Sequence, residues 1–554
     1  MRICKETNEI FFEIVYLFSG LGGLALGAQS ARHEYKGVTG RFRTVVGIDV
    51  DADACKDFEK LTGAPSACMD LFSREQYIAF HGKEPDEGWK EVTPQDIREL
   101  VLRLNEGRNP DGIFLSPPCK GFSGLLSEEK AASEKYQALN GLVDRSIWLV
   151  MEAFKDDPIA LILMENVPRI TSRGAAKLSQ IKNMLKSYGY EINMDTHDAG
   201  ELGGLSQIRK RFLLIARDPR RIPSFIYKPQ RHRVKSIGEL LDTLPMPGDV
   251  ESAGEMHRIP RLQWNVWVRL ALIPPGEDWR ALKDSEYALG HSPRSGSYKI
   301  IPYDEPSNTV TSFTSGIGQS NGASAVADPR IDNVCGYGNK YRVIRSNEPC
   351  TTVTGSRIGS GAQFIADDRI PRFANLYRVI RMDEPSATVT GGAGPSNGAL
   401  SVADTRIRKW SGAGNYEVQR WDMPGKCVTC GDIHSGASAV GDPRIPDSKD
   451  KGVYVIVSES ATWNRPLTTF ELAMLQGLPS RFPDGSPLVL TAKTDTKRRE
   501  HIGNMVPPAA SAGFSKAILE TIMPNYMGDW YWGSSEDGIW VNKKIHIPDT
   551  LILM

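Results

Sequence analysis

Cys119 is the residue of this chain whose setting most suggests a chemical role. It follows an apolar run, Ile113 to Leu115, that reads as a buried strand, and two prolines, Pro117 and Pro118, that end the strand and fix the backbone ahead of the thiol. A stretch rich in Gly and Ser comes after it. A cysteine held in this way fits a nucleophile, but a small apolar side chain that fills a strand end would show the same pattern. This stretch alone leaves both interpretations open.

A second pattern lies near the N-terminus, where a predicted strand, a glycine-rich loop and a helix follow one another. Residues 14 to 18 form the strand, the loop reads Ser19-Gly20-Leu21-Gly22-Gly23, and residues 24 to 28 open the helix. Glycines let the backbone approach a ligand closely, and a helix N-terminus offers unpaired N–H groups. A further predicted strand, residues 45 to 48, ends in Asp49, an acid at the place where a ribose hydroxyl is caught in such units.

These stretches and several others resemble, in order and spacing, the motifs of the DNA cytosine-5 methyltransferases. Each motif alone is weak, but the shared order argues against coincidence. The resemblance covers roughly residues 11 to 215 and 460 to 520. The matching stretches are Phe18-Ser19-Gly20-Leu21-Gly22-Gly23, Pro117-Pro118-Cys119, Glu165-Asn166-Val167, Gln207-x-Arg209-x-Arg211, Arg465-Pro466-Leu467-Thr468 with Glu471, Leu475-Gln476-Gly477, and Gly503-Asn504-Met505-Val506-Pro507.

The resemblance implies an α/β fold, namely a Rossmann-like S-adenosylmethionine-dependent methyltransferase domain with an inserted, mostly β, target recognition domain. It divides the chain into a catalytic domain (1–215), a recognition domain (216–460) and a C-terminal return to the catalytic domain with a tail (461–554).

The resemblance also implies the roles of four catalytic residues. Cys119 would add to carbon 6 of cytosine, Glu165 would hold the amino group and ring nitrogen, and carbon 5 would then accept a methyl group. For Glu165 the structural alternative is a carboxylate that caps the next helix. Arg209 and Arg211 alternate along the predicted strand that runs to Ile215, so both are expected to face the pocket and stabilise the thiolate or a phosphate.

The implied cofactor is S-adenosylmethionine. The family has an acid for the adenine amino group where this chain has Asp70, and a glutamate is more usual where it has Asp49. Lys120 stands where a glutamine is usual, so the role of that glutamine is not transferred. No metal is expected, because Cys427 and Cys430 form the only close cysteine pair. The expected cofactor-binding residues are Phe18, Ser19, Gly20, Leu21, Gly22, Gly23, Asp49, Val50, Asp70, Leu71, Pro118, Asn504 and Val506.

Composition sets the expected partners and location. The 554 residues are 40% hydrophobic, which is enough to bury the cores of two or more domains. The formal net charge is zero, which argues against nonspecific coating of nucleic acid. Eight scattered cysteines, no membrane-length apolar run and no secretion pattern favour the cytoplasm. The expected partner is double-stranded DNA, and the target base must turn out of the duplex to reach the active site. We expect a monomer that does not contact a membrane. A cognate restriction endonuclease is a possible further partner.

One basic stretch stands out. Between Arg209 and Lys235 there are ten Lys or Arg residues and one acid, Asp218. This composition suits an edge that contacts phosphates, although a solvated surface run is the plainer interpretation.

Four repeats occupy the middle of the chain. They begin at Tyr298, Tyr341, Tyr377 and Tyr416, and each runs through a Pro turn and a Gly-rich loop to an Asp-x-Arg-Ile ending. The period predicts a tandem array of small β units. We expect some of their Gly/Ser/Asn loops, with the adjoining basic stretch, to contact DNA around the turned-out base. The arginines of the endings are expected to pair with the aspartate two residues before them rather than with phosphate; they are Arg330, Arg369, Arg406 and Arg444.

Other segments have simpler expectations. Residues 73 to 92 read as a polar insertion without a function, Thr93 and Pro94 open a helix that reaches about Leu104, and a helix spans about 136 to 154. Residues 160 to 164 form a strand, and helices are expected at 469 to 477 and 508 to 522, before a tail with strands.

Two other functions fit part of the pattern. A methyltransferase that acts on cytosine in RNA would use the same catalytic residues, although the long recognition region favours DNA. A noncatalytic DNA-binding relative is opposed by the presence of Cys119, Glu165 and Arg211.

Overall fold

The computed structural model describes most of the chain between residues 2 and 540. The described residues are 2–4, 7–118, 133–222, 227–283, 288–290, 293, 297–311, 325–330, 340–345, 360–366, 379–381, 401–403, 417–420, 438–441, 449, 451–458, 460–527, 533–535 and 538–540. Cys119, Lys120, Cys427 and Cys430 lie outside them.

A nine-stranded sheet forms the centre of the larger part of the molecule. Its order is β3-β4-β2-β6-β7-β9-β8, with β5 beside β4 and β1 beside β2. The strands are β1 (Arg2–Cys4), β2 (Glu9–Leu17), β3 (Arg32–Tyr35), β4 (Val38–Asp49), β5 (Ser66–Cys68), β6 (Gly112–Leu115), β7 (Leu161–Asn166), β8 (Glu191–Asp198) and β9 (Lys210–Arg217). Strands β5, β4, β2, β6 and β7 are parallel, whereas β9 runs antiparallel to both β7 and β8. The expected Rossmann-like α/β fold is confirmed, and the carboxyl ends of the parallel strands share one edge.

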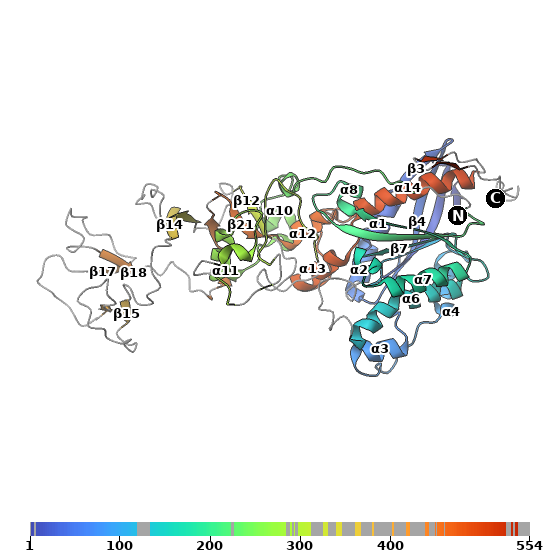
Figure 1. Cartoon of the computed structure of the whole chain (residues 1–554), viewed down its shortest axis with the longest axis horizontal. Coiled ribbons are helices and arrows are strands. Elements are labelled where there is room, and N and C mark those ends of the chain that lie inside the picture. Colours follow the sequence, from blue (N-terminus) through green and yellow to red (C-terminus); the bar gives the residue numbers. More distant parts are fainter. Residues whose placement is uncertain are drawn as a thin grey trace, which may run out of the picture.

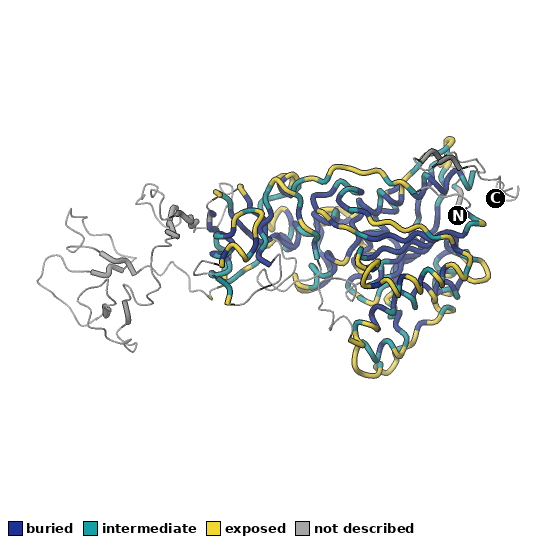
Figure 2. Tube along the Cα trace, in the orientation of Figure 1, coloured by how far each residue is buried: buried dark blue, intermediate teal, exposed yellow. Residues whose placement is uncertain are grey.

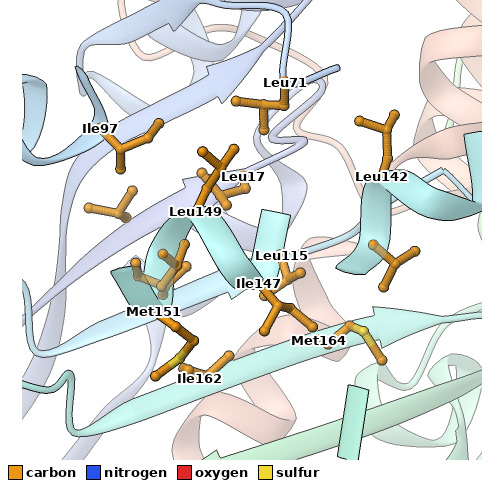
Figure 3. Close-up of a cluster of buried hydrophobic side chains, with 14 of the residues drawn as sticks. Leu17, Leu71, Ile97, Leu115, Leu142, Ile147, Leu149, Met151, Ile162 and Met164 are labelled. Atoms are coloured by element: carbon orange, nitrogen blue, oxygen red, sulfur yellow. The ribbon is translucent and has the colours of Figure 1, made fainter. Parts of the chain in front are cut away.

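Helices cover both faces of this sheet (Figure 1). One face carries α4 (Pro94–Leu104), α6 (Glu134–Ala153) and α7 (Ala175–Ser187), and the other carries α1 (Gly23–Ser30), α8 (Ala199–Gly203) and α14 (Pro508–Tyr526). Because side chains alternate along a strand, Val15 and Leu17 enter the first core while Ile14 and Tyr16 enter the second. Figure 3 shows the first core, and Figure 2 shows how the sheet is buried between the helices.

Local signals account for the helices near the N-terminal half. Thr93 caps α4 in a capping box with Asp96, with Pro94 in the first turn, so this predicted helix is confirmed. The helix predicted at 136 to 154 is confirmed as α6. The supposed insertion 73–92 instead contains α3 (Arg74–His81), capped by Ser73 with Gln76. It packs against α6, where a Cβ at Gly141 would lie 2.8 Å from Gln76 Nε2.

The chain returns to the catalytic domain through α12 (Thr469–Leu475), α13 (Asp495–Asn504) and α14. Ser511 Oγ donates to the Leu24 carbonyl at 2.7 Å, and the Thr491 N–H donates to both Asp57 carboxylate oxygens at 2.9 and 3.0 Å. Asp57 lies on α2 (Ala52–Thr62). The last described helices therefore pack directly on the first ones, which no local signal could indicate.

A second sheet has the order β11-β12-β21-β20-β13-β14. Its strands are β11 (Ile300–Ile301), β12 (Ala325–Asp328), β13 (Lys340–Arg345), β14 (Ser360–Ala366), β20 (Val455–Val457) and β21 (Trp463–Pro466). A tryptophan core supports it: Trp267, on α11 (Trp264–Leu272), stacks on Trp463 with ring centroids 5.9 Å apart.

Each sequence repeat contains one parallel pair of strands. These pairs are β11 with β12, β13 with β14, β15 (Val379–Arg381) with β16 (Ser401–Ala403), and β17 (Glu417–Arg420) with β18 (Ser438–Gly441). The expected Asp–Arg pair is confirmed in the first repeat, where Arg330 Nε and Nη2 both lie 2.9 Å from the Asp328 carboxylate oxygens. Arg369, Arg406 and Arg444 lie outside the described residues.

The remaining elements are short. They are η1 (Pro168–Thr171), α9 (Ile237–Leu241), α10 (Val250–Ala253), η2 (Glu255–His257), β10 (Leu262–Gln263), η3 (Trp279–Leu282), β19 (Lys451–Gly452), β22 (Gly533–Ser535) and β23 (Gly538–Trp540). Among all described helices, none has the length and apolar character to cross a membrane. Within the same residues, no cluster of three or more His, Cys, Asp or Glu side chains could hold a metal ion.

Candidate active site

The sheet order brings the predicted site residues to one edge. Asp49 ends β4, the glycine loop follows β2, Ser116 follows β6 and Glu165 lies near the end of β7, and these four strands are neighbours. Two backbone bonds tie the edge together, from Ser19 N–H to the Ile48 carbonyl (3.1 Å) and from Ser116 N–H to the Leu17 carbonyl (3.3 Å). Cys119 comes one residue after Pro118, the last described residue of this segment.

Glu165 is held by side chains from the strands on either side. Its side chain is 8% exposed, Arg211 Nε lies 2.8 Å from Oε1, and Ser116 Oγ donates to Oε2 at 2.7 Å. The helix cap considered for Glu165 is not seen, because η1 begins after Val167 without a side-chain cap. Sequence reasoning missed Ser116. The feature that could have identified Ser116 is the parallel register of β6 and β7. This register pairs Leu115 with Met164, so the next residues, Ser116 and Glu165, lie side by side.

Arg209 corrects one expectation. It precedes β9, and its side chain is buried, with a residue exposure of 1%. Nη1 donates to the Val310 carbonyl at 2.7 Å, and Nη2 donates to the carbonyls of Gly503 and Met505 at 2.9 and 3.1 Å. A side chain buried in this way does not reach a phosphate on a bound nucleic acid. Arg209 joins the two halves of the catalytic fold to the middle segment, and Arg211 alone of the two contacts Glu165.

The glycine loop adopts a backbone that favours glycine. Gly20 and Gly22 have φ of 50° and 85°, and Phe18, which is not glycine, has φ of 54°. A non-glycine residue in this region carries strain that the surrounding structure must hold in place, as is common at ligand sites. The Ser19 hydroxyl is buried and has no hydrogen-bond partner among the described residues. An unsatisfied hydroxyl in a loop ahead of the α1 N-terminus fits a polar ligand group at this position.

Asp49 secures this loop. Its Oδ2 accepts the Gly20 N–H at 2.8 Å and its Oδ1 accepts the Asp51 N–H at 3.0 Å. Burial raises the pKa of Asp49, and the backbone hydrogen bonds from Asp51 and Gly20 oppose that rise. Val50, the next residue, is 64% exposed, so it presents an apolar surface beside the loop. The expectation that these two residues bind a cofactor remains a prediction.

Asp70 follows the end of β5, the strand that pairs with β4. Its Oδ1 accepts the Phe72 N–H at 3.0 Å, and its Oδ2 accepts the indole N–H of Trp89 at 3.2 Å. Leu71 places its side chain in the first core, labelled in Figure 3, and the residue is buried. Leu21 is likewise fully buried, in a cluster that includes Met505. Trp89 was not predicted as a site residue, because it belongs to a stretch without a motif.

The C-terminal motif lies against the glycine loop. A Cβ on Gly23 would come within 2.2 Å of the Val506 carbonyl oxygen and 2.5 Å of Met505 Cγ. Val506 is buried, whereas Asn504, at the end of α13, is exposed. The structure thus brings Met505 and Val506 to the loop and leaves the role expected of Asn504 untested.

Ion pairs from α13 reinforce this junction. Asp51, which caps α2, accepts hydrogen bonds from Lys497 Nζ at 2.9 Å and His501 Nε2 at 3.1 Å. Burial would raise the pKa of Asp51, but hydrogen bonds from Lys497 and the Ala54 N–H, together with His501, lower it to about 2.

The contact at Gly23 gives a direct stability prediction. Gly23→Ala should lower the free energy of unfolding by about 1–3 kcal/mol, because the added methyl group meets the backbone carbonyl of Val506 as well as the Met505 side chain. Gly290→Ala is the matched control, since a Cβ there meets nothing within 4 Å. Urea denaturation of both variants checks the prediction. Equal midpoints for the two would show that the loop and the C-terminal motif do not pack in this way.

The basic stretch is largely neutralised by acids from elsewhere in the chain. Six of its arginines pair with carboxylates, with nitrogen–oxygen distances of 3.5 Å or less. The pairs are Arg211–Glu165, Arg217–Glu191, Arg220–Asp218, Arg221–Asp157, Arg231–Glu201 and Arg233–Glu239. The exposed lysines Lys210, Lys228 and Lys235 remain as the groups most open to a phosphate. The plainer interpretation of this stretch therefore accounts for most of its charge.

Comparison with known proteins gives consistent matches. The sequence model of the family described as "C-5 cytosine-specific DNA methylase" matches residues 12–255. The chain is 26% identical over 246 residues to "Type II methyltransferase M1.HgaI" of Avibacterium volantium, covering 40% of this chain and 63% of that protein. It is 25% identical over 327 residues to "Type II methyltransferase M.Eco47II" of Escherichia coli, covering 55% and 65%. These matches span just under two thirds of both relatives.

A solved structure, that of the Entamoeba histolytica methyltransferase EhMeth, aligns with a TM-score of 0.45 at 13% identity, covering 92% of this chain and 98% of that one.

Proposed function

Because this chain belongs to the C-5 cytosine-specific DNA methylases, we propose that it methylates carbon 5 of cytosine in double-stranded DNA. The observation that carries the proposal is the Glu165 carboxylate, held by Arg211 and Ser116 at the sheet edge where the segment leading to Cys119 also ends. A buried carboxylate fixed at both oxygens, next to the end of the strand that leads to Cys119, suits the activation of a heterocyclic base.

The cofactor is S-adenosylmethionine, the methyl donor of this family. When bound, it supplies the methyl group that carbon 5 of the base accepts. The described residues that would hold it are the loop from Phe18 to Gly23 with its unpaired Ser19 hydroxyl, Asp49 and Val50, and Asp70. Met505 and Val506 would close the loop from the C-terminal side.

The proposed mechanism assigns one task to each residue at the edge. Glu165 holds the cytosine amino group and ring nitrogen, which makes the ring more electrophilic. The Cys119 thiolate then forms a bond to carbon 6, and the electron pair of the 5,6 double bond moves to carbon 5, which takes the methyl group. A base then takes the proton from carbon 5, the electron pair of that C–H bond restores the 5,6 double bond, and the bond between carbon 6 and sulfur breaks to release the Cys119 thiolate. Arg211 keeps the Glu165 carboxylate in place throughout.

The proposed substrate is cytosine in double-stranded DNA. The reacting carbons lie inside the stacked duplex, so the base must turn out into the pocket. We assign target recognition to residues 216–460, which include the four repeats. Since the curated relatives are named type II methyltransferases, a cognate restriction endonuclease is the partner to seek, and the expected setting is a monomer in the cytoplasm.

Covalent trapping tests this proposal directly. Wild-type protein with S-adenosylmethionine and a duplex that contains 5-fluorocytosine at the target should form a stable adduct, because fluorine cannot leave carbon 5 as the proton does. The target is first located by bisulfite sequencing of DNA from cells that express the chain. The Cys119→Ser variant should give no adduct, since its hydroxyl is a much weaker nucleophile than a thiolate.

Three results would count against the proposal in different ways. An adduct with the matching RNA and none with DNA would make the substrate RNA. An adduct in the Cys119→Ser variant would move the nucleophile elsewhere. No methylated cytosine in cellular DNA, and no adduct with either nucleic acid, would favour a noncatalytic relative.

A further inference from the structure

We infer that Trp89 is a positioning residue for the cofactor: its indole N–H fixes the Asp70 carboxylate in the orientation that receives the adenine amino group. The inference rests on the proposed function, which supplies the cofactor, and on the family resemblance, which implies that Asp70 receives the adenine amino group. It adds a residue from a stretch, 82 to 92, that carries no motif of the family and that the sequence marks only as polar.

The Asp70 carboxylate has one donor on each oxygen. Phe72 N–H bonds to Oδ1 at 3.0 Å, and Trp89 Nε1–H bonds to Oδ2 at 3.2 Å. The first bond is local and tolerates rotation of the carboxylate plane, whereas the second comes from nineteen residues along the chain and fixes that plane. Because a carboxylate oxygen has two lone pairs, each oxygen keeps a free acceptor site. Asp70 is half-buried, so a ligand can reach those sites.

Trp89 is itself held from two sides. Its ring lies against Tyr77 of α3, with centroids 5.1 Å apart, and it packs on the edge of the first core. The Arg145 side chain of α6 ties its segment to the Asp70 segment. Arg145 Nε donates to the Leu71 carbonyl and Nη2 to the Val92 carbonyl, both at 2.9 Å.

The same arginine anchors the segment by charge. Arg145 Nη2 lies 2.8 Å from Glu91 Oε1, and the Arg145 side chain is only 12% exposed. Glu91 Oε2 in turn accepts the Arg74 N–H at 2.9 Å, at the first residue of α3. One buried guanidinium therefore fixes both ends of the pair, Asp70 through Leu71 and Trp89 through Glu91 and Val92.

The consequence for binding is preorganisation. A carboxylate that already points at the amino group loses less rotational freedom when the ligand arrives. Replacement of Trp89 by phenylalanine keeps an aromatic ring beside Tyr77, and it removes the donor together with part of the indole ring system. Its effect should therefore depend on whether the ligand has an amino group for Asp70 to bind.

The test is calorimetric and needs no methyl transfer. S-adenosylhomocysteine and its analogue with purine in place of adenine, which lacks the 6-amino group, are titrated into wild type, Trp89→Phe and Tyr77→Phe. Trp89→Phe should weaken S-adenosylhomocysteine binding about three- to tenfold and change binding of the purine analogue by less than about twofold. Tyr77→Phe, the matched control for packing, should leave both affinities within about twofold of wild type.

A double-mutant cycle separates positioning from a general structural effect. In the Asp70→Ala background, Trp89→Phe should cause no further loss, because the carboxylate that it positions is absent. Equal weakening of both ligands by Trp89→Phe, or a full loss that persists in the Asp70→Ala background, overturns the inference and leaves the proposed function standing. Failure of wild-type protein to bind S-adenosylhomocysteine at all overturns the proposed function itself.

Discussion

Replacement of Glu165 by glutamine should slow methyl transfer by about 10²- to 10⁴-fold and leave cofactor affinity unchanged. Glutamine has nearly the same shape, so the pocket should keep its form. Its amide cannot act as an acid or base toward the cytosine ring, and it replaces the carboxylate oxygen that Arg211 Nε contacts at 2.8 Å. The glycine loop and Asp49 lie at the ends of β2 and β4, which β6 separates from β7, so their contacts are untouched.

Single-turnover methylation under saturating duplex and cofactor measures this effect, since product release does not then limit the rate. Glu9→Gln is a matched control: Glu9 also pairs with an arginine, Arg41 at 3.1 Å, but at the opposite end of β2. It should methylate at the wild-type rate. A Glu165→Gln rate within about threefold of wild type would remove Glu165 from the mechanism, because general acid–base catalysis contributes far more than that.

The sequence predicted those parts of the fold that depend on short-range pattern. The apolar run at residues 14 to 18 identified the later part of β2 (Glu9–Leu17), and the Thr93–Pro94 signal placed the start of α4 at the residue where the structure has it. The Asp328–Arg330 pair was predictable for the same reason, because both partners lie within one turn of chain. The same geometry recurs at Asp278 and Arg280, where the ion pair is 2.8 Å.

Features with distant partners were not predictable. The alternation argument assumed that Arg209 belonged to a strand, but β9 begins at Lys210, and the Arg209 N–H bonds to Asp198 Oδ1 at 3.0 Å ahead of it. Its guanidinium then finds the Gly503 carbonyl, 294 residues away in sequence. Nothing in a local window indicates such a partner.

The charge of the basic stretch also depends on distant partners. A count of charges between Arg209 and Lys235 cannot include acids that the fold brings from other segments. Glu191 comes from β8 and Asp157 from the turn before β7, and both pair with arginines of the stretch. Net charge of a window is a statement about composition, and the electrostatic potential of a surface depends on the neighbours that the fold supplies.

Arg465 should show the largest stability effect of any single residue named here. Its side chain is 0% exposed and lies between two buried carboxylates: Nη2 is 2.8 Å from both Asp328 Oδ2 and Glu471 Oε1. Nη1 also donates to Glu471 Oε2 at 2.9 Å. The residue therefore joins β12 of the second sheet to the first turn of α12. Arg465→Met should lower the free energy of unfolding at pH 7 by about 3–5 kcal/mol, because removal of one partner leaves buried charge uncompensated.

The pH dependence of this loss provides an independent check. In the wild type, burial acts to raise the pKa of Asp328, but Arg465 and Arg330 lower it to about 2. Its contribution to stability is therefore present above the unfolded pKa near 3.8 and is lost as the pH falls through about 2. In Arg465→Met the buried carboxylates should bind protons more readily in the folded state than in the unfolded state. The difference between variant and wild type should thus shrink as the pH falls from 7 to 5.

Urea denaturation followed by tryptophan fluorescence reports on this region, because Trp463 and Trp267 stack beside it. Arg233→Met is the matched control, since Arg233 pairs with Glu239 at 2.7 Å on the surface and should leave the midpoint unchanged. Methionine keeps the unbranched apolar stem of arginine and lacks its guanidinium end, so the packing around the stem is retained. A midpoint equal to that of wild type at pH 7, or a difference that does not change between pH 7 and 5, would mean that the charges of Asp328 and Glu471 are compensated without Arg465.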